Sequence, residues 1–342
     1  MMKTGGSWLG MLGISACVAL CSLSARAETT LVINAFLPAQ DTMNTRVLVP
    51  WAEDVAKATE GRVKIQFPAA SVAAPDQLWN AVRNGVVDGA YLFNGTVSNQ
   101  LKVMQLPELP FMATKSQANS VALWRTYDKY LKAANEYKDF HLLALMVIPT
   151  DPIYSLKGPI ESMRDLQGTK VFAPPGVPAK MMMLAKAGVM SAPAAKMSEP
   201  VAGGMVSAFT GVPELYAEGF KVVRYAKSVT TIPGGVATAS FSLLMNRQKW
   251  ESLPQQDRDI ITKLSGEAFA HRMAAFDEVE ADAHAAAVKS GLEYHAASPQ
   301  FVSDLEKSAS VLVDEWLANA KKAGVDGPAA MAFYRAQSAS AK

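Results

Sequence analysis

The stretch "KVFAPPGVPAK" (170–180) begins as a β-strand and then runs into two adjacent prolines. Residues 170–172 suit a strand, but Pro174 and Pro175 cannot extend it, because proline lacks the N–H that a strand ladder needs. In an α/β sheet, ligands bind in the crevice outside the carboxyl ends of the strands, where such a strand stops. The stretch therefore predicts an α/β sheet with a ligand crevice bordered by Phe172.

Strands and helices alternate on both sides of this stretch. In the first part of the chain, the patterns predict strands over 31–36, 63–67, 86–93 and 141–148, and helices over 45–59, 75–83 and 116–137. The order restarts after Pro149, with strands predicted over 170–173 and 238–245 and helices over 179–187 and 198–209. The run over 141–148 is continuously apolar, as in a buried parallel strand. This order predicts two α/β domains, with the chain crossing between them near Pro149 and Val236.

A longer helical pattern runs from Gln255 to about Lys289. At 1.5 Å per residue it would measure about 54 Å, which exceeds one small domain. A coiled coil is the alternative, but the apolar stripe is too irregular and too rich in alanine for heptads. We predict a two-domain periplasmic-binding-protein clamshell with one long helix that spans both domains and bends near Gly266. The first domain is expected to hold residues 28–150 plus about 238–270, and the second 151–237 plus about 271–342.

The first 27 residues differ in composition from the rest of the chain. Lys3 provides a positive start, an apolar run follows, and Ala25-Arg26-Ala27 matches an A-x-A cleavage site. We interpret residues 1–27 as a secretory signal peptide cleaved after Ala27, which predicts a periplasmic protein. A lipoprotein signal ending at Cys17 is the alternative, but the residues after this cysteine stay apolar. No later stretch is apolar enough to span a membrane.

The charge balance and the cysteines exclude several classes of function. The full chain has 33 Lys and Arg against 31 Asp and Glu, and removing residues 1–27 takes away Lys3 and Arg26, which leaves a net charge of zero. Without a basic excess, binding to nucleic acid is not expected. Both cysteines, Cys17 and Cys21, lie in the signal peptide. The exported chain therefore has no disulfide and no cysteine metal site.

No catalytic motif is present. The sequence lacks a G-x-S-x-G elbow, a P-loop and a G-x-G-x-x-G loop, and none of its four histidines has H-E-x-x-H spacing. An exported enzyme that uses two carboxylates, such as Asp88 and Asp151, is an alternative for which no spacing argues. We expect no catalytic residues, no metal and no cofactor. An exported chain of two crossed α/β units suits a binding protein that closes around a ligand.

Five stretches resemble one family in the right order. They are "WAEDVAKATEGRVKIQFPAA" (51–70), "LWNAVRNGVVDGAYLFNG" (78–95), "LPELPFM" (106–112), "KGPIESMRDLQGTKV" (157–171) and "SFSLLMNRQKWESLPQQDRDII" (240–261). The chain resembles the DctP-type substrate-binding proteins of tripartite ATP-independent periplasmic (TRAP) transporters. The resemblance implies a receptor that binds a small organic molecule, usually a carboxylate, between two domains. It also implies delivery to a two-part membrane permease driven by an ion gradient.

The family's ligand-binding arginines have no counterpart at the matching positions. The position of the arginine that forks onto the ligand carboxylate resembles Phe172, and the place of a second arginine lies near Asp151. A family asparagine is matched by Glu214. Under this alignment the ligand is not a simple carboxylate, because aromatic faces with carboxylates suit amines and neutral or aromatic molecules. In the alternative alignment, Lys170 or Lys180 replaces the arginine.

The predicted cleft residues follow from these positions and from the strand ends. They are Phe36, Tyr91, Phe93 and Asn94 in the first domain, and Asp151, Tyr154, Phe172, Glu199 and Glu214 in the second. Phe36 and Phe93 equally suit a core, because alternate residues of a buried strand are all covered. Phe172→Ala is expected to weaken binding while leaving the fold intact. A ligand-sensing subunit that docks on a membrane receptor is the alternative to a transport role.

Overall fold

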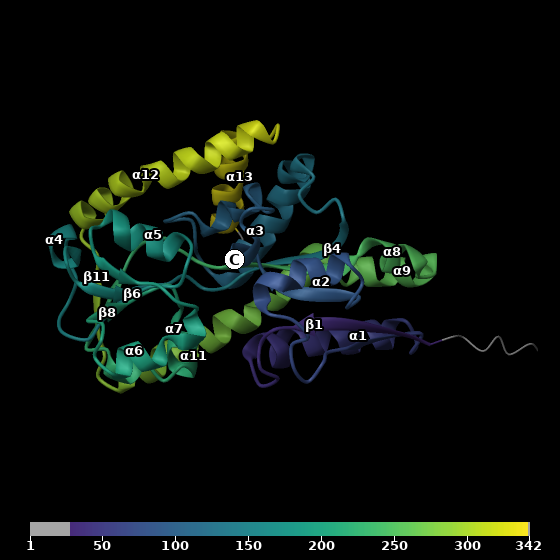
Figure 1. Cartoon of the computed structure of the whole chain (residues 1–342), viewed down its shortest axis with the longest axis horizontal. Helices are drawn as coiled ribbons and strands as arrows, with labels where there is room; N and C mark the ends of the chain where they lie inside the picture. Colours follow the sequence, from purple (N-terminus) through teal and green to yellow (C-terminus); the bar gives the residue numbers. More distant parts are fainter. Residues whose placement is uncertain (1–27, 341–342) are drawn as a thin grey trace, which may run out of the picture.

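The computed structural model describes residues 28–340, so the predicted signal peptide lies outside the described residues. The chain forms two lobes, each built around one sheet (Figure 1). The sheet of lobe I has the order β2-β1-β3-β10-β4, and the sheet of lobe II has the order β11-β9-β5-β8-β6-β7. Helices pack on both sheets, which confirms the α/β clamshell. None of the helices in the described part of the chain combines the length and hydropathy of a membrane span.

Lobe I follows the predicted alternation closely. Its strands are β1 (Thr29–Ala35), β2 (Val63–Gln66), β3 (Gly89–Phe93), β4 (Phe140–Val147) and β10 (Ser240–Asn246). Its helices are η1 (Met43–Leu48), α1 (Val49–Ala58), η2 (Pro75–Gln77), α2 (Leu78–Arg83), η3 (Asn94–Val97), η4 (Val103–Glu108), α3 (Ser116–Lys129), η5 (Leu131–Ala134) and α8 (Arg247–Ser252). β4 was predicted as a parallel strand, but it lies at the sheet edge and pairs antiparallel with β10. It is buried because α3 and α10 (Gly266–Ala270) contact it.

Lobe II is built from shorter elements. Its strands are β5 (Ile153–Ser155), β6 (Lys170–Phe172), β7 (Gly188–Met190), β8 (Ala208–Phe209), β9 (Ser228–Thr231) and β11 (Glu293–Ala296). Its helices are α4 (Met163–Leu166), α5 (Val177–Leu184), η6 (Ala194–Lys196), α6 (Ser198–Ala202), α7 (Glu214–Gly219) and η7 (Val223–Tyr225). The helix predicted over 198–209 is wrong, because α6 ends before Gly203 and Gly204 and the last two residues form β8. Gly204 has φ 65°, which ends the helix.

Two crossings join the lobes side by side, next to Pro149 and Val236. The N–H of Ile148 donates to the carbonyl of Ala239 at 3.1 Å, and the N–H of Val236 donates to the carbonyl of Asp151 at 3.1 Å. Gly235, which precedes Val236 in the second crossing, has a φ of +75°, and a Cβ at this position would lie 1.5 Å from Thr150 Oγ1. Only glycine fits this turn, so the crossings form a compact hydrogen-bonded hinge.

The predicted single long helix is broken into α9 (Gln255–Lys263), α10, η8 (His271–Met273) and α11 (Ala274–Lys289). The break occurs at Gly266, where φ is +61° and a Cβ would lie 2.7 Å from the indole ring of Trp124. A left-handed residue cannot continue an α-helix. Only the last segment, α11, therefore runs from lobe I to lobe II (Figure 1).

Two carboxylates tie α11 to both lobes. Asp277 accepts hydrogen bonds from the first two N–H groups of α3, in lobe I, at 2.6 and 3.1 Å. Glu280 accepts in the same way from the first two N–H groups of α7, in lobe II, at 2.9 and 2.8 Å. A carboxylate is favourable at a helix N-terminus because it pairs with free N–H groups and with the helix dipole. One face of α11 thus caps a helix from each lobe.

A second bridging helix, α12 (Pro299–Lys322), passes over both lobes (Figure 1). Phe301 and Leu305 at its start belong to the core of lobe II, whereas Trp316 near its end belongs to the core of lobe I. The following α13 (Gly327–Ser340) packs on α3 of lobe I. The expectation that residues 271–342 all belong to the second domain therefore needs correction. The tail returns to lobe I because the apolar stripe of α12 is long enough to cover both cores.

Candidate functional site

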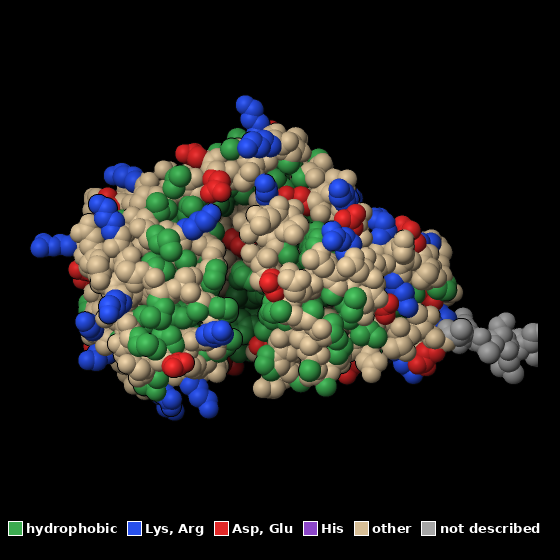
Figure 2. Space-filling model, viewed as in Figure 1, with side chains coloured by type: hydrophobic (Ala, Val, Ile, Leu, Met, Phe, Trp, Pro, Cys, Tyr) green, Lys and Arg blue, Asp and Glu red, His purple; other side chains and the backbone are tan. Residues whose placement is uncertain are grey.

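The carboxyl ends of the strands in the two lobes face each other across the hinge. β4 of lobe I leads directly into the first crossing, and β5 of lobe II begins directly after it. Because β8 runs antiparallel to β5, the carboxyl end of β8 lies beside the amino end of β5, next to the hinge. Figure 2 shows a groove between the lobes with hydrophobic side chains on both sides. This cleft is where α/β sheets bind ligands.

Lobe I presents a row of aromatic rings to this cleft. The ring of Tyr91 stacks between those of Phe36 and Phe241, with centroids 5.4 and 5.0 Å away and nearly parallel planes. Phe93 continues the row, 5.4 Å from Phe241. Phe36 and Phe93 are half-buried, whereas Tyr91 is fully buried and its hydroxyl has no hydrogen-bond partner. The predicted residues Phe36, Tyr91 and Phe93 are thus brought together, and we call them, with Phe241, the aromatic row.

Asn94 lies beside the aromatic row, but its amide is already occupied. Its Nδ2 donates to Ser240 Oγ at 2.9 Å, and its Oδ1 accepts from Ser242 Oγ at 2.6 Å. Ser240 in turn donates to the carboxylate of Glu108 at 2.7 Å. Burial raises the pKa of Glu108 to about 7, although the bonds from Ser240 lower it. This network holds the ends of β3 and β10 together, so Asn94 has a structural role beside the cleft.

Asp151 lies on the first crossing with its side chain buried; the backbone N–H groups of Asp151 itself, Ala237 and Gly211 face its carboxylate, but none forms a hydrogen bond of good geometry with it. Burial raises the pKa of Asp151 to about 8, even though the backbone amides of Ala237 and Gly211 oppose the shift. The hydroxyls of Thr150 and Tyr154 are likewise buried without a partner. A buried polar group without a hydrogen bond costs about 1–3 kcal/mol. Thr150 and Asp151 lie on the first crossing, whereas Tyr154 lies within β5.

Phe172 belongs to a second row of rings, in lobe II. Its Cα pairs with that of Phe209, which pairs with Tyr154 on the next strand, so the three side chains share one face of the sheet. The rings of Tyr154 and Phe209 stack with centroids 4.4 Å apart. Phe172 has no exposed surface and packs in a cluster with Met197 and Val201. The structure therefore places Phe172 and the predicted cleft residue Tyr154 together in the core of lobe II, neither with exposed surface.

Glu214 and Glu199 are not available as free carboxylates in the cleft. Glu214 is buried and bonds through one oxygen to His284 Nδ1, at 3.0 Å, and through the other to the hydroxyl of Tyr294. Neighbouring Glu280 has its pKa raised to about 7 by burial, which the amides of α7 partly offset. Glu199 is exposed on α6. Sequence reasoning missed these partners because they come from α11 and β11, far along the chain.

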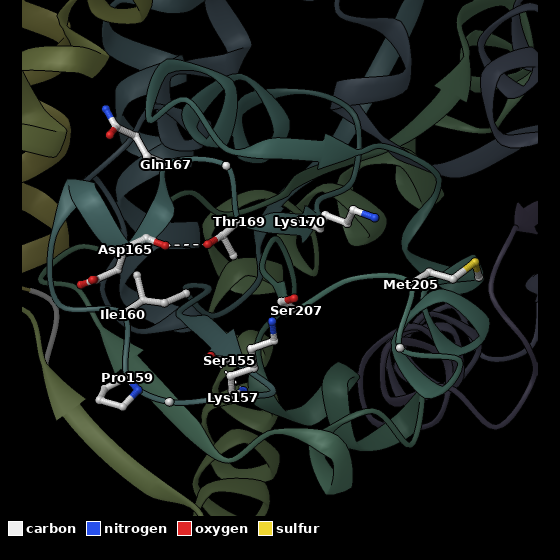
Figure 3. Close-up of a pocket in the computed structure, with 13 residues that line it drawn as sticks. Ser155, Lys157, Pro159, Ile160, Asp165, Gln167, Thr169, Lys170, Met205 and Ser207 are labelled. Carbon is white, nitrogen blue, oxygen red and sulfur yellow. Dashed lines mark hydrogen bonds between the residues drawn. The ribbon is translucent and has the colours of Figure 1, made fainter.

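Lys170 and Lys180, the two lysines considered as replacements for the family arginine, do not lie at the carboxyl edge of lobe II. Lys170 is exposed and lines an open depression of about 690 Å³ in lobe II (Figure 3). The depression lies where β5 ends and β6 begins, at the opposite edge of the sheet from the hinge. Lys180 pairs with Glu315 of α12 at 3.5 Å, and both side chains are more than half exposed. Neither lysine replaces an arginine at the carboxyl edge.

Two further contacts at the cleft escaped the sequence analysis. The hydroxyl of Tyr216 on α7 donates to Oδ1 of Asp41 in lobe I at 3.4 Å, and neighbouring Leu215 packs in a core cluster of lobe I. Phe241 pairs with Phe93 in the register of β10 with β3. The start of the strand predicted over 238–245 was the available signal for Phe241, but the antiparallel pairing was not foreseen. No three His, Cys, Asp or Glu side chains between residues 28 and 340 are arranged to hold a metal ion.

Comparisons with known proteins agree with this architecture. The family model for the bacterial extracellular solute-binding protein, family 7 (DctP), matches residues 33–319. A Comamonas testosteroni protein named outer membrane transporter protein TsaT is 42% identical over 326 residues, which cover 95% of this chain and 96% of that protein. These matches confirm the resemblance that the sequence motifs predict.

Solved structures give the same result. A TRAP periplasmic solute-binding protein from Bordetella bronchiseptica with bound mandelate has a TM-score of 0.85 and 27% identity, covering 92% of this chain and 100% of that chain. A marine metagenome protein specific for aromatic acid ligands, in complex with 3-hydroxybenzoate, has a TM-score of 0.81 and 28% identity, covering 92% and 98%. This chain therefore belongs to the DctP family of extracellular solute-binding proteins, the periplasmic receptors that bind small organic molecules for TRAP transporters.

Proposed function

We propose that this receptor binds a small aromatic molecule in the cleft between the aromatic row and the carboxyl edge of lobe II. The observation that carries the proposal is the stack of Phe36, Tyr91 and Phe241, which ends in a half-buried ring at the end of β1. A ligand ring that stacks on such a row gains about 0.5–1.5 kcal/mol beyond its buried area. The bound mandelate and 3-hydroxybenzoate of the two structural relatives support an aromatic ligand.

The proposal also includes the cellular location of the receptor and its membrane partner. The pattern of residues 1–27 supports export to the periplasm with cleavage after Ala27. The partner is a TRAP permease in the membrane, which receives the ligand when the lobes open about the hinge. The receptor releases its ligand chemically unchanged and has no catalytic residues.

A thermal-shift screen tests the aromatic preference. Benzoate, 3-hydroxybenzoate and mandelate are compared with cyclohexanecarboxylate and lactate, which carry the same charge without an aromatic ring. A compound present at 100 times its dissociation constant should stabilise the protein by about 2.7 kcal/mol. We expect the three aromatic compounds to raise the melting temperature and the two aliphatic ones to have little effect.

A pair of variants locates the ring-binding surface. Phe36→Ala removes the half-buried end of the aromatic row and should weaken binding of the best aromatic compound by about tenfold, or 1.4 kcal/mol. Phe333→Ala is the control, because Phe333 is also half-buried but lies on α13, where it packs near Tyr130. Equal affinity for benzoate and cyclohexanecarboxylate, or equal loss in the two variants, would contradict the proposed site.

A further inference from the structure

We propose that Tyr216 of lobe II and Asp41 of lobe I form a latch across the ligand cleft, and that this latch sets how fast the ligand is released. The inference rests on the proposed function, because the ligand leaves when this cleft opens. It adds the contact that must break as the lobes separate. Tyr216 and Asp41 are positioning residues in this proposal, since they act on the closure of the lobes.

The latch is a direct polar contact between the lobes. The hydroxyl of Tyr216, on α7, donates to Oδ1 of Asp41 at 3.4 Å. Within residues 28–340, it is the only side-chain hydrogen bond or ion pair that joins residues 28–147 and 240–270 of lobe I to residues 153–231 of lobe II. The other direct hydrogen bonds between the lobes lie at the hinge. A change at the Tyr216 hydroxyl therefore alters the contact between the lobes and leaves the hinge intact.

Apolar packing holds the ring of Tyr216 between the lobes. The ring packs against the buried cluster of lobe I and α11 that includes Trp51, and also against the cluster of lobe II that includes Phe209. Neighbouring Leu215 is buried and belongs to the lobe I cluster, although α7 is part of lobe II. The ring of Phe276 on α11 lies 6.3 Å from that of Tyr216, between centroids. The hydroxyl of Tyr216 is thus presented to lobe I by a ring that is already held in place.

The lobe I half of the latch follows the aromatic row directly. Asp41 lies on the loop that joins Phe36, the half-buried end of the row, to η1. The same Oδ1 of Asp41 accepts from the N–H of Met43 at 2.8 Å, which ties the latch to the start of η1. The pKa of Tyr91 is raised first by burial and then by the nearby Tyr216 and Asp41, in agreement with a latch close to the row. Breaking the latch therefore loosens the loop beside the ring-binding surface.

The latch is weaker than the links that α11 makes to each lobe. Asp277 accepts two N–H groups of α3 at 2.6 and 3.1 Å, and Glu280 accepts two N–H groups of α7 at 2.9 and 2.8 Å. Bonds from N–H groups to a carboxylate are strong, and each of these links consists of two. The bond between Tyr216 and Asp41 is single and long. We therefore expect the lobes to separate at the latch, while α11 keeps its links to both.

One hydrogen bond is sufficient to change the release rate. A hydrogen bond contributes about 1 kcal/mol, which corresponds to about fivefold in an equilibrium constant. A less populated closed state weakens the apparent affinity by the same factor. Differences in affinity between variants of one site arise mostly in the dissociation rate. Loss of the Tyr216 hydroxyl should therefore speed ligand release about fivefold and change the association rate little.

A double-variant cycle tests this in stopped-flow release of 3-hydroxybenzoate. Tyr216→Phe removes only the hydroxyl and keeps the packed ring, and it should speed release about fivefold. Asp41→Ala removes the acceptor and the cap of η1 and should speed release at least as much. In the Asp41→Ala background, Tyr216→Phe should have no further effect, because the bond is already absent. Tyr225→Phe is the matched control, since Tyr225 is half-buried on η7 of lobe II and lies beside Arg224.

Hydrogen exchange tests the latch in the protein without added ligand. Tyr216→Phe should speed the exchange of backbone amides over residues 37–44 of lobe I, across the cleft from the substitution. Tyr225→Phe should leave this exchange unchanged. A role of Tyr216 confined to the core of lobe II would not alter exchange in lobe I. Thermal melting of each variant confirms that it is folded.

Two results would overturn the latch. One is a Tyr216→Phe variant with wild-type exchange over residues 37–44, and the other is an effect of Tyr216→Phe on release that persists in full in the Asp41→Ala background. If aromatic compounds bind but either result is found, only the latch fails and the aromatic site stands. If no aromatic compound binds, the proposed function fails, and the exchange of residues 37–44 alone decides whether the lobes are latched.

Discussion

The substitution Phe172→Ala distinguishes two roles for this side chain. Phe172 either stabilises the core of lobe II or contacts the ligand in the cleft. The sequence suggested a ligand contact, with binding weakened and the fold intact. The structure instead gives Phe172 no exposed surface and surrounds it with Tyr154, Phe209 and other buried side chains. We therefore expect Phe172→Ala to act mainly on stability.

The size of the effect follows from the buried surface. A buried aromatic side chain removes about 150–250 Å² from water, and at about 25 cal/mol per Å² this corresponds to about 4–6 kcal/mol. Alanine retains part of that surface, but the cavity left behind adds a further cost. We expect Phe172→Ala to lower the free energy of unfolding by about 4 kcal/mol. Phe172→Leu keeps most of the volume and should cost about 1 kcal/mol.

Urea unfolding followed by circular dichroism measures this difference in the absence of ligand. Phe333→Ala is the matched control, because its ring is half-buried on α13 and its loss should cost clearly less. Phe172→Leu is then titrated with the best aromatic acid, and its dissociation constant should stay within about threefold of wild type, less than 1 kcal/mol. The reasoning is refuted if Phe172→Ala unfolds within about 1 kcal/mol of wild type while binding weakens tenfold or more.

The remaining predictions concern the broken helix and the buried acids. Gly266→Ala should destabilise the protein by more than about 1 kcal/mol, because φ is +61° there and the new Cβ would lie 2.7 Å from Trp124. Gly158→Ala is its control, since nothing lies within 4 Å of a Cβ at that position and its φ is not positive; equal melting temperatures of the two variants would contradict the packing at Gly266. Stability should fall as the pH rises from about 5 to 8, because Glu108 and Glu280, with pKa values of about 7, and Asp151, with a pKa of about 8, bind protons more tightly in the folded than in the unfolded chain. The stabilisation is complete below the unfolded pKa, near 4, and lost as the pH passes the folded values. Melting temperatures across this range should decline in wild type and decline less in Asp151→Asn; a rise with pH would contradict the direction of these shifts.

Local patterns predicted the regular elements of lobe I well. β1 and α1 occur close to where apolar spacing placed them, because that spacing depends only on neighbouring residues, whereas α3 begins at the predicted Ser116 but ends at Lys129, short of the predicted end at 137. The helix predicted over 198–209 is wrong, because the short α6 is followed by β8, a strand of two residues. Such a strand has no periodicity of its own. It exists because β5 and β6 lie on either side and pair with it.

The cleft was predicted in part for the same reason. Phe36 and Phe93 end strands in the sequence, and the structure brings them together with Tyr91. Glu214 also lies near the cleft, but its carboxylate is occupied by His284 and Tyr294, which are far along the chain. The pairing state of a polar group depends on such distant partners, which motif alignment does not supply.

The sequence by itself determined the α/β class and the family resemblance and predicted the crossings near Pro149 and Val236, because each depends on residue type and local order. Only the tertiary structure decided the break at Gly266, where a distant indole fills the space that a side chain would need. It also decided that α13 returns to lobe I and that Phe172 lies in the core. Asp151 was suspected from alignment, but its burial follows from how the two crossings pack around it. Burial and pairing are properties of the packed chain, since they depend on contacts between residues that the sequence keeps far apart.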